Sequence, residues 1–382
     1  MRRFMGLLLV VCLVLAGMPM MVSAAEVPAK SAVLMDVATG TVLFEENPHE
    51  QLPPASVTKV MTMLLIMEAI DSGRISWEDS VTASATAAAK GGSQVYLKEG
   101  ETMTVTEMLK AIAVSSANDC ACAMAEHIAG SEEAFVSMMN SRAAELGMQD
   151  THFVNCTGLD DSPEAAQHRT SAYDIALMSR QLLKYHPEIK KFTTIWMDTL
   201  RGGTFGLSNT NKLVRFYNGA TGLKTGFTSG AGYCLSASAQ REDMELIAVV
   251  MGCETSKDRF NACKMLLDRG FANWTVVTPA LKGDLEVKVK LGKAKTVQAV
   301  PGEENPLLLE KGLKNAVTTD IELDETVDAP VSTGQKLGTM TVRAGDRILA
   351  RIPLVAKEPV QRLSYWDIVV MLLKKVAMVK EP

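Results

Sequence analysis

One short stretch, PPASVTKVMTMLLIM at residues 53–67, limits what this chain can fold into. Two prolines open it and a nearly unbroken apolar run follows, which predicts a loop that turns into a helix buried on most of its sides. Ser56 stands at the start of the run and Lys59 follows three residues later. On a helix the two side chains share one face, so the sequence places a hydroxyl beside an amine in apolar surroundings.

This pairing has a chemical use. A serine hydroxyl is a weak nucleophile at neutral pH and needs a base within hydrogen-bonding reach. Lysine can be that base only when it is neutral, and burial or a second cation nearby favours the neutral amine. The alternative interpretation of the same residues is structural: Ser56 caps the helix, Lys59 is solvated, and the S-x-x-K pattern arises by chance.

Composition and charge exclude several classes of protein. A chain of 382 residues, 47% hydrophobic and 22% charged, is predicted to form about two globular domains. The net charge of −5, the lack of a basic run and an aromatic content of 5% argue against nucleic acid as a partner. The five histidines are scattered without an H-E-x-x-H pattern, so we expect no metal and no cofactor.

The first 24 residues are predicted to be a signal peptide. Arg2 and Arg3 precede an apolar run over residues 7–20, and the small residues at 22–24 suit cleavage. A permanent anchor is the alternative. Cleavage would remove two positive charges, so the mature chain carries −5 − 2 = −7. Export permits disulfides, yet the spacing of the six remaining cysteines shows no framework, and we predict buried thiols, with one or two bridges as the alternative.

The order of the predicted elements indicates an α+β domain. Two apolar runs around a glycine turn predict a β-hairpin over residues 31–45. Helices and loops follow to about residue 190, one of them opening with a capping-box pattern at Thr104–Glu107. Strand patterns occupy residues 205–251, and a helix over 259–271 closes the unit. Such segregation favours helices clustered on an antiparallel sheet.

The sequence pattern changes after residue 275. Short alternating runs broken by turns predict a small all-β domain over residues 276–360. Residues 361–382 are predicted to be an amphipathic helix, with Trp366 on its apolar side and Lys374 and Lys375 on its polar side. It is too short and too charged to span a bilayer, but it suits a membrane interface. A terminal helix packed against a core is the alternative.

Two further segments complete a pattern with Ser56 and Lys59. Ser116-Ala117-Asn118 falls in a predicted break between helices, and Lys224-Thr225-Gly226 falls in a predicted strand. Alone, each is most often a helix break or a strand end. In this order, spacing and local structure, the three segments resemble the penicillin-recognising serine acyltransferases, and among them the D-alanyl-D-alanine carboxypeptidases, or low-molecular-mass penicillin-binding proteins.

The resemblance covers nearly the whole chain and implies a domain organisation. It implies a signal peptide at 1–24, a catalytic domain with the penicillin-binding transpeptidase fold at 25–275, a β-rich domain at 276–360 and a membrane-associating helix at 361–382. It also implies the roles of the residues. The catalytic group is Ser56 as nucleophile, Lys59 as general base and Ser116 as proton relay, and the substrate-binding group is Asn118, Lys224, Thr225, Gly226 and Phe227.

Backbone N–H groups of Ser56 and Phe227 would hold the oxyanion. Phe227 is a mild departure from relatives with a polar residue there, and it can equally be a packing residue. The implied partners are the peptidoglycan pentapeptide, β-lactams as inhibitors that acylate Ser56, and a membrane surface outside the cytoplasm.

Three alternatives remain at this point. A β-lactamase on the same fold would need a carboxylate over the acyl-enzyme, and Glu164 is the candidate. A penicillin-sensing or cell-wall-binding protein would be acylated without turning over. A Ser-His-Asp hydrolase is disfavoured because the sequence holds no G-x-S-x-G.

Overall fold

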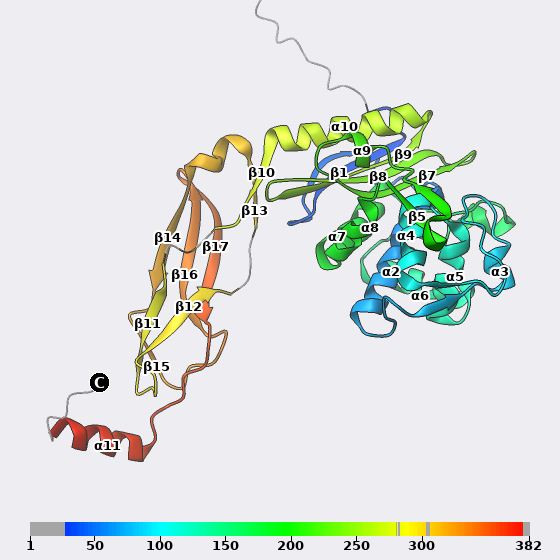
Figure 1. Cartoon of the computed structure of the whole chain (residues 1–382). Coiled ribbons are helices and arrows are strands. Elements are labelled where there is room, and N and C mark those ends of the chain that lie inside the picture. Colours follow the sequence, from blue (N-terminus) through cyan, green and yellow to red (C-terminus); the bar gives the residue numbers. More distant parts are fainter. Residues whose placement is uncertain (1–26, 280, 282, 303–305, 377–382) are drawn as a thin grey trace, which may run out of the picture.

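The computed structural model describes residues 27–279, 281, 283–302 and 306–376. The predicted signal peptide at residues 1–24 and the last part of the predicted terminal helix, residues 377–382, lie outside that range. The described chain forms a large mixed domain, then an elongated β-rich domain, with helix α11 at its far end (Figure 1).

A five-stranded antiparallel sheet organises the large domain, in the order β2-β1-β9-β8-β7. β1 and β2 form the hairpin that the glycine turn predicts, and β7, β8 and β9 form a meander that returns β9 to the side of β1. β7 is therefore an edge strand, with one side free of strand partners. The strands are β1 Ser31–Asp36, β2 Val42–Glu46, β7 Ala220–Thr228, β8 Gly232–Arg241 and β9 Met244–Cys253.

Both faces of this sheet are buried. Along β1, Val33 and Met35 belong to one hydrophobic core, whereas Ala32 and Leu34 belong to another. Alternate side chains of a strand point to opposite faces, so the uninterrupted apolar run of β1 is explained by cores on both sides. The long helix α10, Ser256–Asn273, covers one face, and the helical cluster covers the other (Figure 1).

The helical cluster begins where the sequence provides caps. The Thr104 and Glu107 side chains form the predicted capping box, and Ser131 and Ser171 cap the next helices through their hydroxyls. The helix that Ser171 caps, α7, packs on the sheet, and α2 lies against α7. The helices are α2 Lys59–Asp71, α4 Val105–Ser115, α5 Asn118–Ala129, α6 Glu132–Glu145 and α7 Ala172–Tyr185.

Short helices, strands and 3-10 turns connect the longer elements. Two small antiparallel sheets pair β3 with β4 and β5 with β6. The short helices are α3 Ala85–Ala88, α8 Lys190–Thr193 and α9 Leu213–Phe216, the strands are β3 Ser80–Thr82, β4 Thr102–Thr104, β5 Met197–Leu200 and β6 Phe205–Ser208, and the 3-10 turns are Ala55–Thr58, Pro163–Gln167, Pro187–Ile189, Arg201–Gly203 and Lys311–Ala316.

The second domain is all-β, as predicted, with its own hydrophobic core. A pair of strands, β10 Trp274–Val277 and β13 Leu307–Glu310, leads into a six-stranded sheet in the order β14-β16-β17-β12-β11-β15. The strands of that sheet are β11 Leu285–Lys290, β12 Thr296–Pro301, β14 Val317–Leu323, β15 Thr326–Asp328, β16 Lys336–Ala344 and β17 Arg347–Ala356.

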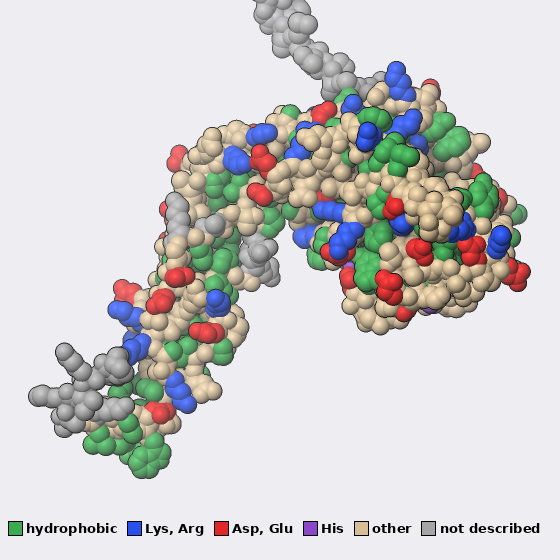
Figure 2. Space-filling view, in the orientation of Figure 1, with side chains coloured by type: hydrophobic (Ala, Val, Ile, Leu, Met, Phe, Trp, Pro, Cys, Tyr) green, Lys and Arg blue, Asp and Glu red, His purple; other side chains and the backbone are tan. Residues whose placement is uncertain are grey.

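Helix α11, Tyr365–Val376, follows the β-rich domain, and most of its described apolar side chains are exposed, Trp366 to 72% and Leu373 to 63%. The alternative of a helix packed against a core is therefore wrong for the described part of α11. Figure 2 shows these hydrophobic side chains gathered at the lower left end of the molecule. Across the described ranges, none of the helices has the length and apolar character needed to traverse a bilayer.

The fold class is thus confirmed as α+β followed by an all-β domain. The six cysteines of the predicted mature chain are buried and free, which confirms the prediction of buried thiols against that of bridges.

Candidate active site

The serine and the predicted base lie together at the start of α2. Ser56 sits in the 3-10 turn Ala55–Thr58, and Lys59 opens the helix behind it. The Lys59 Nζ lies 3.0 Å from the Ser56 Oγ and donates a second hydrogen bond to the Thr157 carbonyl at 2.8 Å. Pro54, not Ser56, occupies the cap position of this turn, and no side chain caps it. The Ser56 hydroxyl is therefore directed at the amine instead of at the helix backbone.

The environment of Lys59 favours its neutral form. The residue is fully buried among the apolar side chains of α2 and its neighbours. Burial lowers the pKa of Lys59 from 10.5 to about 7, although Cys156 and Asp119 oppose this shift. A large fraction of the molecules thus holds a free amine beside the serine at neutral pH.

The second segment lies where α4 passes into α5. Ser116 ends α4 in the left-handed region, with φ of 64°, and Asn118 begins α5. The Asn118 Nδ2 donates to the Gly91 carbonyl at 2.7 Å. The Ser116 Oγ and the Asn118 Oδ1 are buried and find no hydrogen-bond partner among the described residues. Buried polar atoms are rarely left unpaired, so these two are candidates for contact with a ligand.

The third segment lies on the edge strand β7, which packs against the nucleophile turn. Lys224 is fully buried and its Nζ donates to the Thr225 carbonyl at 2.8 Å. The Thr225 Oγ1 donates to the Thr210 Oγ1 at 2.7 Å. Burial, with the nearby charges of Lys59 and Arg259, lowers the pKa of Lys224 well below its ordinary value. An anion entering the site would favour the charged form of this amine.

Gly226 brings β7 close to the nucleophile turn. A Cβ at this position would lie 2.6 Å from the Pro54 carbonyl oxygen and 3.1 Å from the Val57 nitrogen. The resemblance implies a substrate-binding role for this glycine, and the structure adds that the turn carrying Ser56 leaves no room for a side chain there. Phe227 points outward, 52% exposed, and its ring stacks on Tyr233 at 4.3 Å between centroids.

Comparison with known proteins decides the family. A family model described as D-alanyl-D-alanine carboxypeptidase matches residues 18–255, and one described as penicillin-binding protein 5, C-terminal domain, matches residues 274–362. The chain belongs to the D-alanyl-D-alanine carboxypeptidase family. It is a serine-type peptidase, and the activity class that its sequence motifs implied is confirmed.

Relatives and solved structures agree with this family. The carboxypeptidase is 46% identical over 344 residues to the D-alanyl-D-alanine carboxypeptidase DacF of Bacillus subtilis, covering 88% of this chain and 87% of that one. It is 34% identical over 368 residues to DacC of Escherichia coli, covering 92% and 90%. The structure of penicillin-binding protein 5 from Haemophilus influenzae superimposes with a TM-score of 0.74 at 31% identity, over 89% of this chain and all of that one.

Four residues near the site carried no signal in the carboxypeptidase sequence. The Thr157 carbonyl binds Lys59 through backbone, which leaves no mark on residue type. Thr210, fifteen residues earlier in a loop, accepts the hydrogen bond from the Thr225 hydroxyl. Arg259 on α10 donates from its Nη1 to the Gly226 carbonyl at 2.9 Å. Asp119 is buried, and its carboxylate accepts from two backbone N–H groups of the loop that precedes β4.

The rival chemistries find no support in this geometry. Glu164 is exposed in the turn Pro163–Gln167, and no hydrogen bond links it to Ser56 or Lys59 in the described structure. The buried His168 bonds the Thr58 hydroxyl through its Nε2 at 2.8 Å, not that of Ser56, so it does not serve the nucleophile. Across the described ranges, no cluster of three or more His, Cys, Asp or Glu side chains could hold a metal ion.

Proposed function

We propose that this carboxypeptidase removes the terminal D-alanine of peptidoglycan pentapeptides through an acyl-enzyme on Ser56. The observation that carries the proposal is the 3.0 Å contact between the Ser56 Oγ and the Lys59 Nζ, together with the lowered pKa of that amine. Lys59 takes the serine proton as the Oγ attacks the carbonyl of the penultimate residue. The bond to the terminal D-alanine then breaks.

The other segments supply binding and proton transfer. We assign the Ser116 hydroxyl, unpaired in the described structure, to relaying the proton to the leaving amine. Asn118 holds the substrate amide through its unpaired Oδ1. Lys224 and the Thr225 hydroxyl bind the terminal carboxylate, and that negative charge raises the pKa of Lys224. A charged Lys224 in turn favours the neutral form of Lys59 while substrate is bound.

The edge of β7 receives the peptide. Its outer side has no strand partner in the described sheet, so an extended substrate backbone can align there. The backbone N–H groups of Ser56 and Phe227 are assigned to the oxyanion, as the sequence motifs implied. Water then attacks the acyl-enzyme, and the product leaves with its new carboxylate; Lys59 and Ser116 are the two candidate bases for that step.

β-Lactams acylate the same serine, on this proposal, and leave slowly. Penicillin-binding protein D2 of Listeria monocytogenes, solved in an ampicillin-bound form, is 31% identical with a TM-score of 0.57, over 65% of this chain. A β-lactamase would release the drug quickly, and a penicillin sensor would not turn over peptide.

One substitution tests the nucleophile. Ser56→Ala is expected to abolish both the release of D-alanine from a D-Ala-D-Ala peptide and covalent labelling by a fluorescent penicillin. Ser137→Ala, at an exposed serine on α6, is the matched control and should retain both. Labelling of Ser56→Ala would place the nucleophile elsewhere. Rapid hydrolysis of penicillin by the unmodified enzyme would favour the β-lactamase.

We also propose that the enzyme is exported and held at the extracytoplasmic face of the membrane by residues 361–382, beyond a catalytic domain at 25–275 and a β-rich domain at 276–360. The exposed apolar side chains of α11 support a membrane surface as its partner, and Lys374 and Lys375 add charge that favours anionic lipid.

Vesicles test the attachment. The mature chain is expected to sediment with vesicles that contain phosphatidylglycerol. A chain ending at residue 362 should remain in solution and keep its penicillin labelling. Equal sedimentation of the two chains would place the contact outside the helix.

A further inference from the structure

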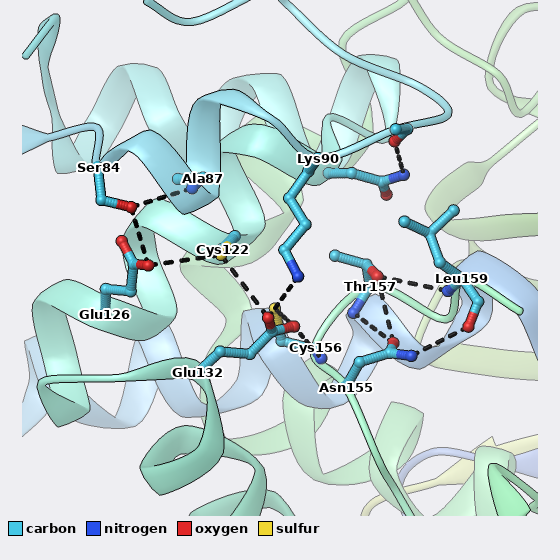
Figure 3. A network of polar contacts seen from close by, with 12 residues as sticks. Ser84, Ala87, Lys90, Cys122, Glu126, Glu132, Asn155, Cys156, Thr157 and Leu159 are labelled. Atoms are coloured by element: carbon cyan, nitrogen blue, oxygen red, sulfur yellow. Dashed lines mark hydrogen bonds and ion pairs between the residues drawn. The ribbon is translucent and has the colours of Figure 1, made fainter. Parts of the chain in front are cut away.

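A half-buried ion pair lies behind the active site, outside the residues assigned to catalysis. Lys90, just after α3, and Glu132, the first residue of α6, pair at 2.5 Å, with side chains only 22% and 14% exposed. Burial alone would raise the pKa of Glu132, but hydrogen bonds from Lys90 and Cys156 outweigh it and lower that pKa. Figure 3 shows the two side chains pointing toward each other, with Cys156 beside the carboxylate.

From Glu132, contacts lead to the general base. The Glu132 Oε1 accepts a hydrogen bond from the Cys156 backbone N–H and another from its thiol, each at 3.2 Å. The next residue, Thr157, offers the carbonyl that binds Lys59 at 2.8 Å. One carboxylate thus anchors the backbone that receives a hydrogen bond from the catalytic amine.

The same turn is held rigidly from within. The Asn155 Oδ1 accepts from the backbone N–H of Thr157 at 3.1 Å and from that of Gly158 at 2.6 Å. Gly158 packs directly on the turn that carries Ser56, because a Cβ added there would lie 1.9 Å from the Ala55 carbonyl oxygen. A displacement of Cys156 would therefore be passed on to Thr157 and to the position of Lys59, and would not be absorbed locally.

From Lys90, contacts lead to the other side of the site. The carbonyl of Gly91, the next residue, accepts from the Asn118 Nδ2, and the carbonyl of Ser93 accepts from the Asn118 backbone N–H, both at 2.7 Å. The ion pair therefore joins two separate backbone segments. One segment ends at the base, and the other ends at the residue assigned to the substrate amide.

We propose that the Lys90–Glu132 ion pair is a positioning device that sets the approach of Lys59 to Ser56 and fixes Asn118 opposite them. The inference rests on the proposed function, since it assigns the pair to the acylation step of that reaction. Neither side chain touches the reacting atoms. Misplacement of a reacting group by about 1 Å can cost about a hundredfold in rate, so a smaller displacement of Lys59 is expected to cost about tenfold.

Acylation by a fluorescent penicillin tests the proposal in the full mature chain. Glu132→Gln keeps an acceptor for Cys156 but removes the charge, and Lys90→Met removes the partner. Each is expected to lower the acylation rate constant at saturating penicillin about tenfold, with an almost unchanged concentration for half-saturation. The double variant should be no slower than the slower single one, because the two residues act as a unit. Lys90→Arg, which keeps the charge, should restore most of the rate.

Glu68→Gln is the matched control. It removes a similarly exposed ion pair, formed with Arg142 at 2.8 Å on the distal part of α2. It should acylate at the unmodified rate. The proposal is overturned if Glu132→Gln acylates normally, if Glu68→Gln is equally slow, or if Lys90→Arg fails to recover.

The same data separate this inference from the proposed function. If the unmodified chain releases no D-alanine, the proposed function fails, while penicillin acylation still reports on the position of Lys59. If D-alanine is released and all variants acylate equally, only the positioning role fails.

Discussion

The buried amine of Lys59 should make the protein less stable than it would be without it. An unfolded lysine holds its proton up to its ordinary pKa of 10.5, whereas folding lowers the pKa of Lys59 to about 7. On folding, Lys59 must either release its proton or carry the charge into the interior, and both lower the free energy of unfolding. Replacing Lys59 with methionine, of similar length and without charge, removes this cost together with all acylation.

The size of the effect follows from the same values. At pH 7 the perturbed amine costs roughly 4 kcal/mol, since each pH unit between the two pKa values corresponds to about 1.4 kcal/mol. Methionine leaves the Thr157 carbonyl without its hydrogen bond from Lys59, which costs about 1–3 kcal/mol. Lys59→Met should therefore raise the free energy of unfolding by about 2 kcal/mol at pH 7.

The direction in which stability changes with pH follows from the same two pKa values. Between about pH 7 and 10.5 the unfolded chain holds the Lys59 proton and the folded chain does not, so stability due to this group rises with pH. The methionine variant lacks that rise, and its advantage should vanish near about pH 9. Lys224 is present in both proteins. Without the Lys59 amine beside it, the pKa of Lys224 is lowered less, so this group also makes Lys59→Met more stable than the unmodified protein.

Urea unfolding from pH 7 to 10 measures this. Far-ultraviolet circular dichroism follows mainly the helices, and the described α-helices apart from α11 belong to the large domain. Lys257→Met, at an exposed lysine on α10, is the control and should not change the slope with pH. Parallel curves for the unmodified protein and Lys59→Met across this range would mean that folding does not lower the pKa of Lys59.

Three other outcomes are expected. The rate of penicillin acylation should rise with pH as a single proton leaves near pH 7, because only neutral Lys59 accepts the serine proton; a flat profile would exclude it as the base. Gly226→Ala should destabilise the protein by about 1–3 kcal/mol and suppress labelling, since its Cβ meets the nucleophile turn; normal labelling would contradict this packing. Asp119→Asn should cost about 1–3 kcal/mol in urea unfolding by weakening the bonds from the Val95 and Leu97 N–H groups; unchanged stability would show that the charge contributes nothing there.

The sequence predicted those parts of the fold that depend on local chemistry. The turn at Gly40, the capping box of α4 and the alternation of the C-terminal strands each follow from a few neighbouring residues. The predicted helix ends were less accurate: α5 already begins at Asn118, inside the predicted break, because one left-handed residue, Ser116 with φ of 64°, and Ala117 are enough to redirect the chain between the two helices.

Within the site, the motifs predicted residue types but not the contacts that hold them. Lys59 and Ser56 were paired correctly because three residues separate them on one turn. The Thr157 carbonyl is 98 residues away in the chain and acts through backbone, so no pattern of residue types could reveal it. Lys90 and Glu132, 42 residues apart, are ordinary surface charges by sequence and become half-buried only when α3 and α6 both pack against α5.

The described structure concentrates its unfavourable features where the reaction is assigned. Of the five buried side-chain atoms that lack a partner among the described residues, three belong to Ser116, Asn118 and Arg259. Two fully buried lysines lie in the same site. The apolar residues around Ser56 and Lys59 thus do more than fill a core, because they deny Lys59 the water that would keep it charged. The same burial that weakens the folded state produces a base at neutral pH.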